Sequence, residues 1–226
     1  IPPVYEVSNK SLRDDSGRIV TRVFFYGDED KDGQNSFASF MRMFEGNPAW
    51  RVTKNNEWVS ISLRRDPRLM IFANLPLFGE DDPEEKAINH LSAYLEAKHL
   101  EPSIYIHRGH SFHVKSTMRR IGHNARIVIL GSCGGYNNIN EVLSRSSDAH
   151  IISSKQTGTM RVNEPIIQEI NSCLSAGKDI DWIAIWRDLS SRFGKGSTKE
   201  QFDDYIPPYQ NLGAIFIKAY NKAMKP

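Results

Sequence analysis

The fold is decided by two stretches, Ser-Ile-Tyr-Ile-His-Arg-Gly-His at residues 103–110 and Ile-Val-Ile-Leu-Gly-Ser-Cys-Gly-Gly at residues 127–135. Each begins as a short, continuous apolar run, which is typical of a strand buried on both faces of a sheet. Each run then passes into glycine and a chemically active side chain, His110 or Cys133. Ligands of open parallel sheets bind beyond the carboxyl ends of the strands. The two stretches therefore predict neighbouring strands with a functional site at their ends.

Helical and strand patterns alternate around these two stretches. A helix is expected to start at Asp82, with Pro83 at its first position, and to reach about Lys98. Residues 149–153 predict another strand, and Asn163 predicts the start of another helix. This alternation predicts an α/β fold, a three-layer sandwich in which helices flank a mostly parallel central sheet.

The N-terminal third is expected to contribute two hairpins. Residues 4–7 and 18–26 flank a polar turn, and residues 50–53 and 58–63 are joined through two asparagines. No repeat or linker interrupts the chain, so we expect residues 1–226 to form a single domain. Because the chain begins with isoleucine rather than methionine, we also expect it to be part of a larger protein.

Composition excludes several classes of function. The 29 Lys and Arg residues nearly balance the 27 Asp and Glu residues, which argues against nucleic acid or an anionic membrane as partner. No apolar run approaches the ~18 residues of a membrane span. The two cysteines, Cys133 and Cys173, show no zinc-binding spacing. Cys173 falls on the apolar face of a predicted helix and is expected to pack in the core, and the sequence does not indicate a cellular compartment.

A cysteine that follows a buried strand among glycines can expose its sulfur beside free backbone N–H groups. Those N–H groups can stabilise an oxyanion. A histidine on the neighbouring strand end can take the thiol proton and later return it to a leaving group. His110 and Cys133 are therefore the candidate reactive pair, and the residues alone support an acyl-transferring thiol.

This arrangement resembles the caspase-like cysteine peptidases, a group that includes caspases, metacaspases, legumains, gingipains, clostripain and separases. The resemblance lies in residues 104–111 and 127–133, with histidine before cysteine along the chain. It implies a caspase-like fold and a cysteine endopeptidase that needs no cofactor and acts on a peptide or protein. Carried over, His110 would be general base and acid, Cys133 the nucleophile, and the backbone N–H groups of Gly109 and Cys133 the oxyanion hole.

Other histidines compete for the role of base. His107 is the alternative to His110, and the Gly-His alignment favours His110. His113 is expected on a helix surface, and His150 is expected to be structural.

The acidic loop after the strand ending at Tyr26 has three possible interpretations. Asp28, Asp30 and Asp32 alternate as in the first half of a calcium loop, although the twelfth position is Ser39 rather than glutamate. A calcium site simpler than an EF-hand is one reading. The second interpretation is an acidic wall that selects arginine or lysine in a substrate, which would mean cleavage after basic residues. A solvated turn is the third.

The loop of Ser154, Lys155 and Gln156 follows the predicted strand 149–153. In the caspase-like family the equivalent segment often lines the pocket for the substrate residue before the cleaved bond. The resemblance therefore implies substrate binding here, and an ordinary strand–helix connection is the alternative.

Two other functions remain open from the sequence. Residues 131–135 fit Gly-x-Cys-x-Gly, the nucleophile elbow of glutamine amidotransferases and of cysteine hydrolases of the α/β-hydrolase kind. Those enzymes place the histidine after the nucleophile, and His150 is the sole histidine after Cys133. A caspase-like module kept for binding without catalysis is the second alternative.

Overall fold

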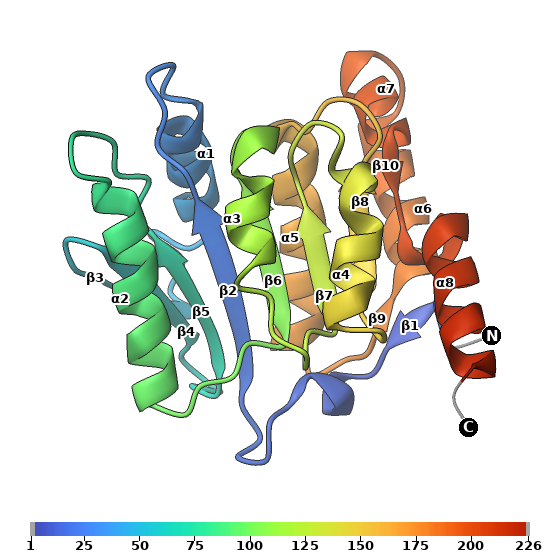
Figure 1. Ribbon diagram of the computed structural model, residues 1–226, viewed down its shortest axis with the longest axis horizontal. Helices are drawn as coiled ribbons and strands as arrows, with labels where there is room; N and C mark the ends of the chain where they lie inside the picture. Colours follow the sequence, from blue (N-terminus) through green and yellow to red (C-terminus); the bar gives the residue numbers. More distant parts are fainter. Residues whose placement is uncertain (1–2, 225–226) are drawn as a thin grey trace.

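The computed structural model describes residues 3–224, which form a central eight-stranded sheet flanked by helices (Figure 1). The strands lie in the order β10-β8-β7-β6-β2-β5-β4-β3. The five strands from β8 to β5 in this order run parallel. Strand β10 pairs antiparallel with β8, β4 pairs antiparallel with β5, and β3 pairs antiparallel with β4. Their bounds are β2 Ile19–Phe25, β3 Trp50–Lys54, β4 Trp58–Leu63, β5 Leu69–Asn74, β6 Ile104–Arg108, β7 Ile127–Leu130, β8 His150–Ser154 and β10 Tyr205–Ile206. The predicted mostly parallel α/β sheet is confirmed.

Helices cover both faces of the sheet. Helices α2, α3 and α4 lie in front of it in Figure 1, and α1 and α5 lie behind it. Helix α8 packs beside α4, and α6 packs beside α5. The helices are α1 Asp32–Met41, α2 Pro83–Ala97, α3 Val114–Met118, α4 Ile139–Arg145, α5 Met160–Ser175, α6 Trp182–Phe193, α7 Ser197–Asp203 and α8 Leu212–Ala223, with 3-10 turns at Asn9–Leu12, Ser111–His113, Gly135–Asn138 and Pro208–Gln210. None of the helices in the described part of the chain could cross a membrane.

Packing on both faces of the sheet explains why the central strands are mostly apolar. All seven residues of β2 are buried. Val23 and Phe25 join the core that contains the α1, α5 and α6 side chains. Phe24 joins the core that contains residues of α3, α4 and α8. Alternate side chains of β2 therefore fill different cores, and both faces of this strand are mainly apolar, with Thr21 and Arg22 as buried polar exceptions.

One of the two predicted hairpins is wrong. Strand β1, Glu6–Val7, pairs antiparallel with β9, Ile180–Asp181, and not with β2. The backbone N–H of Asn9 donates to Asp179 Oδ1 at 2.7 Å, which holds the N-terminal segment against that distant part of the chain. The hairpin of β3 and β4 is confirmed, with Trp50 opposite Leu63.

The helix starts differ in detail from the expectation. Helix α2 begins at Pro83 as predicted, but Asp82 has a φ of 47° and makes no side-chain capping hydrogen bond. Helix α5 begins at Met160, one turn before Asn163, because the Thr159 side chain accepts a hydrogen bond from the backbone N–H of Arg161.

Candidate functional site

The carboxyl ends of the parallel strands meet at one edge of the sheet, at the top of Figure 1. His107 on β6 is level with Phe24 on β2 and with Leu130 on β7, and Leu130 is level with Ser153 on β8. The loops that leave these strands therefore begin side by side. They carry the acidic segment, His110, Cys133 and the residues after Ser154.

His110 and Cys133 line the same cavity, which has a volume of about 250 Å³. Three loops and residues of α1, α5 and α7 contribute to its wall. Other lining residues are Asp32, Ser36, Arg108, Gly109, Gly131, Ser132, Thr157, Gly158, Thr159, Met160, Asn163 and Gln201. The structure thus brings the two predicted reactive side chains, and the predicted oxyanion-hole glycine, to one place.

Two hydrogen bonds fix the loop that carries Cys133. The Ser154 hydroxyl donates to the carbonyl oxygen of Ser132 at 2.7 Å, and the backbone N–H of Gly134 donates to the carbonyl oxygen of Gln156 at 2.7 Å. Gly134 has a φ of 63°, which favours glycine at this turn. Cys133 lies between these two anchors and is exposed, so its thiol is presented on a restrained backbone.

Glycine is also required where the two loops touch. A Cβ on Gly158 would lie 2.2 Å from the carbonyl oxygen of Gly131, much closer than any real contact. The Asn163 side-chain amide donates to that same carbonyl at 2.9 Å. Asn163 therefore holds the Cys133 loop in place from within α5.

His110 is oriented by the acidic loop. Its Nε2 lies 2.9 Å from Asp30 Oδ2 and 3.9 Å from Asp28 Oδ2, and its side chain is 34% exposed. Its ring stacks on Phe112 at a centroid distance of 5.4 Å. Because Nε2 is engaged by Asp30, Nδ1 is the ring nitrogen left for other partners.

The other two histidines of this segment have structural roles. His107 is fully buried, and its Nδ1 lies 2.7 Å from the Thr117 hydroxyl. Burial lowers the pKa of His107 to about 3. It is therefore uncharged at neutral pH, and it does not line the cavity. His113 is half-buried rather than on a helix surface, because it binds Asp28 at 2.9 Å and stacks on Tyr26.

The acidic loop forms a different cluster from the predicted calcium trio. Ligand atoms of Asp28, Asp30 and His110 all lie within 4.8 Å of one another. Asp32 is not in this group, because it begins α1 and its backbone N–H donates to Asp30 Oδ1 at 2.9 Å. Asp28 Oδ2 is buried and has no hydrogen-bond partner. A histidine thus stands where the sequence predicted a third aspartate.

The residues predicted to bind substrate act mainly within the protein. Ser154 is fully buried, and its hydroxyl and the carbonyl of Gln156 both hold the Cys133 loop. Lys155 is exposed, and its backbone N–H donates to Asp204. The following residues, 157–159, line the cavity instead. Substrate binding by Ser154, Lys155, Gln156 and Asp28 stays a prediction.

Arg108, which lines the cavity, forms an ion pair that the sequence did not predict. Arg108 Nη2 donates to Glu164 Oε1 at 2.9 Å, and both side chains are buried. Burial raises the pKa of Glu164 although Arg108 acts to lower it. Arginine at the end of an apolar strand was the available signal, because a buried arginine needs a partner.

No protein-family model matches this chain. No curated protein matches it. The solved structures similar to it include two mutants of the NFeoB domain of S. thermophilus, one bound to GDP and one to mGDP, each 12% identical with a TM-score of 0.34. The first covers 91% of this chain and 89% of its own, and the second covers 92% and 90%. A GDP-bound mutant of the S. thermophilus FeoB G-domain is 10% identical, with a TM-score of 0.33 and coverage of 91% and 89%.

The peptidase prediction is not supported, because none of these three neighbours is a cysteine peptidase. The caspase-like family and fold assignment, the endopeptidase activity with cleavage after basic residues, and the peptide or protein substrate do not stand. The amidotransferase, cysteine-hydrolase and caspase-like binding alternatives are also unsupported. These TM-scores are too low to assign nucleotide binding to this chain. The sequence also contains no Gly-x-x-x-x-Gly-Lys-Ser/Thr motif, which binds phosphate in many nucleotide-binding proteins.

Proposed function

We propose that the cavity at the carboxyl edge of the sheet is a reactive-thiol site that forms a covalent adduct with a small acyl compound. Cys133 is the nucleophile, His110 the base, and Asp30 the residue that positions His110. The observation that carries this proposal is the shared cavity of an exposed thiol and an imidazole whose Nε2 is held at 2.9 Å by a carboxylate.

The chemistry follows from the residue types. The imidazole of His110 takes the thiol proton, and the sulfur of Cys133 forms a bond to the acyl carbon. The bond to the leaving group breaks, and that group departs with the proton from the imidazole. Backbone N–H groups of Gly109 and Cys133 are the proposed donors to the oxyanion. A cavity of about 250 Å³ suits a small acyl group.

Alkylation by iodoacetamide near neutral pH tests the proposal. Cys133 should be labelled about tenfold faster than Cys173, because burial raises the pKa of the Cys173 thiol and only a thiolate reacts. His110→Ala and Asp30→Asn should each slow labelling of Cys133. His90→Ala is the matched control, since His90 forms a similar pair with Glu57 at 2.7 Å on the exposed surface of α2. Slow, equal labelling of both cysteines would refute the proposal.

A divalent cation at Asp28, Asp30 and His110 is the second candidate. Their ligand atoms cluster within 4.8 Å, and Asp28 Oδ2 is buried without a hydrogen bond. The imidazole nitrogen favours zinc or manganese over the calcium predicted from the sequence. Calorimetry with calcium and zinc on the wild type and Asp30→Ala tests this. Absence of heat in the wild type with either ion would exclude the metal site.

A further inference from the structure

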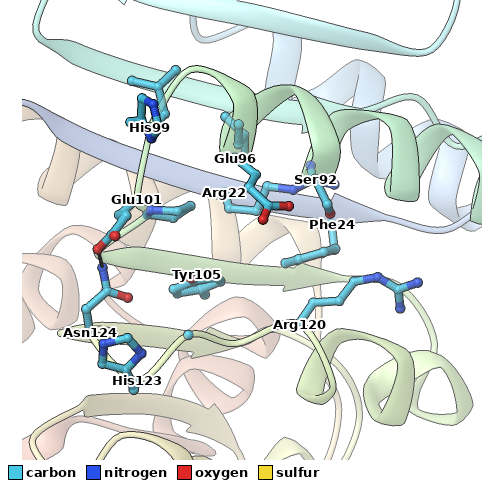
Figure 2. Close-up of a pocket in the computed structure, with 14 residues that line it drawn as sticks. Arg22, Phe24, Ser92, Glu96, His99, Glu101, Tyr105, Arg120, His123 and Asn124 are labelled. Carbon is cyan, nitrogen blue, oxygen red and sulfur yellow. Dashed lines mark hydrogen bonds between the residues drawn. The ribbon is translucent and has the colours of Figure 1, made fainter.

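A second cavity of the described residues lies away from the thiol site. It has a volume of about 560 Å³ and is formed by α2, the start of β6 and the segment before β7 (Figure 2). Arg22 and Tyr105, which are level with each other on β2 and β6, are among its lining residues. Its wall is therefore built on the sheet itself, on the face that carries α2 and α3.

Arg22 is a buried cation without a counter-ion. Its residue is 2% exposed, Nη1 donates to the carbonyl oxygen of Val23 at 3.0 Å, and Nη2 is buried with no hydrogen-bond partner. Its guanidinium carbon lies 4.4 Å from the centre of the Phe24 ring. Burial lowers the pKa of Arg22 to about 9. Burying a charge in this way is costly unless a partner of opposite charge is present.

The nearby polar side chains do not supply that partner. Glu96 and Glu101 lie at the exposed rim, and no ion pair joins either of them to Arg22 among the residues described. Glu101 instead accepts a hydrogen bond from Asn124 at 3.2 Å. Arg120, the second arginine of the cavity, is already paired with Glu85. Arg22 is thus the lining cation that remains available to a ligand.

Part of the remaining wall is apolar. Leu95, Leu100, Pro102 and the rings of Phe24 and Tyr105 line the cavity. Ligand sites typically combine such walls with a few polar groups that fix orientation.

We propose that this cavity binds a small organic acid, whose carboxylate or phosphate pairs with Arg22 and whose apolar body packs against Phe24, Leu95 and Leu100. The planar guanidinium suits both anions, because its fork of N–H donors matches carboxylate and phosphate oxygens. This proposal is independent of the chemistry at Cys133.

Binding of benzoate, phenyl phosphate and the neutral analogue benzamide tests the proposal. Thermal melting and the NMR signal of the Arg22 Nε–H are followed while each probe is titrated into the full chain. Benzoate or phenyl phosphate should raise the melting temperature and shift the Arg22 signal, and benzamide should do so at least tenfold more weakly. The better of the two acids identifies the head group.

Two variants and a control separate binding from folding. Arg22→Met removes the charge but keeps most of the side-chain volume, and it should abolish the response to both acids. Leu95→Trp should fill the cavity and have the same effect while Arg22 is retained. Arg51→Met, on the exposed side of β3, should respond like the wild type. Equal responses to benzamide and benzoate, an undiminished response of Arg22→Met, or no response of the wild type at millimolar concentrations would overturn the proposal.

Discussion

Removal of the Glu164 carboxylate is expected to destabilise the protein by several kcal/mol. Arg108 and Glu164 lie 2.9 Å apart, with side chains only 2% and 11% exposed. At an effective dielectric constant of about 20, the attraction at this distance is about 6 kcal/mol before desolvation is subtracted. Glu164→Leu leaves the buried guanidinium uncompensated and should cost about 3–5 kcal/mol. Glu164→Gln should cost less, because its amide oxygen still accepts a hydrogen bond.

A double variant that removes both charges tests whether the Arg108–Glu164 pair stabilises the protein or only offsets the cost of its own burial. Since burial raises the pKa of Glu164 above 4.5 despite Arg108, folding favours its protonated form. The folded protein then binds more protons than the unfolded chain, so this group lowers stability as the pH rises from 4.5 through its folded pKa. Arg108→Met with Glu164→Leu should therefore match the wild type to within about 1 kcal/mol. Urea unfolding measures all four proteins, and a Glu164→Leu cost below about 1 kcal/mol would refute the reasoning.

Three further predictions concern other groups near the sheet. Burial raises the pKa of Glu84 to about 8, so stability should fall between pH 4.5 and 8. In Glu84→Gln, the loss of unfolding free energy over this pH range should be smaller by about 2 kcal/mol, a value that allows for the partial solvent exposure of Glu84. Urea unfolding at several pH values measures this difference. Gly158→Ala should cost about 1–3 kcal/mol and slow alkylation of Cys133, because its Cβ meets the carbonyl of Gly131. Burial lowers the pKa of His150 to about 3, so stability should fall as the pH drops from 6.5 to 3, and less so in His150→Asn.

The parts of the fold that the sequence predicted depend on local burial. Residues 104–106 of β6 and the whole of β7 are continuous apolar runs because helices cover both faces of the sheet, and such runs can be recognised in the sequence. The placement of His110 and Cys133 at one cavity then follows from parallel pairing, since strands that start level also end level.

The parts that it missed depend on single long-range contacts. Strand β1 has only two residues, and its pairing with β9 accompanies the bond between Asn9 and Asp179, which lie 170 positions apart. The predicted helix start at Asn163 is wrong, because α5 already begins at Met160 and the Asn163 side chain donates to the carbonyl oxygen of Gly131. His113 pairs with Asp28 across 85 positions, so no local pattern placed it in the site.

Function was harder to predict from the sequence than the fold or the position of the site. Glycine, histidine and cysteine at the ends of strands specify where a thiol and an imidazole lie, and many unrelated proteins use that edge of a sheet. The peptidase prediction depended on the family resemblance alone, and it is not supported. Specificity depends on the side chains around the thiol, such as residues 157–159, which the strand pattern does not determine.

The two buried arginines also show that the sequence does not reveal whether a buried charge has a partner. Arg22 lies within β2 and Arg108 at the end of β6, and the sequence alone does not show which of the two has a partner. They differ because Arg108 meets Glu164, 56 positions away, and Arg22 meets no carboxylate among the residues described. A buried charge without a partner lowers stability, whereas its apolar replacement need not. If residue 22 contributed only to stability, methionine would serve the fold better than arginine. The charge of Arg22 is therefore explained best by an anion that binds in the cavity.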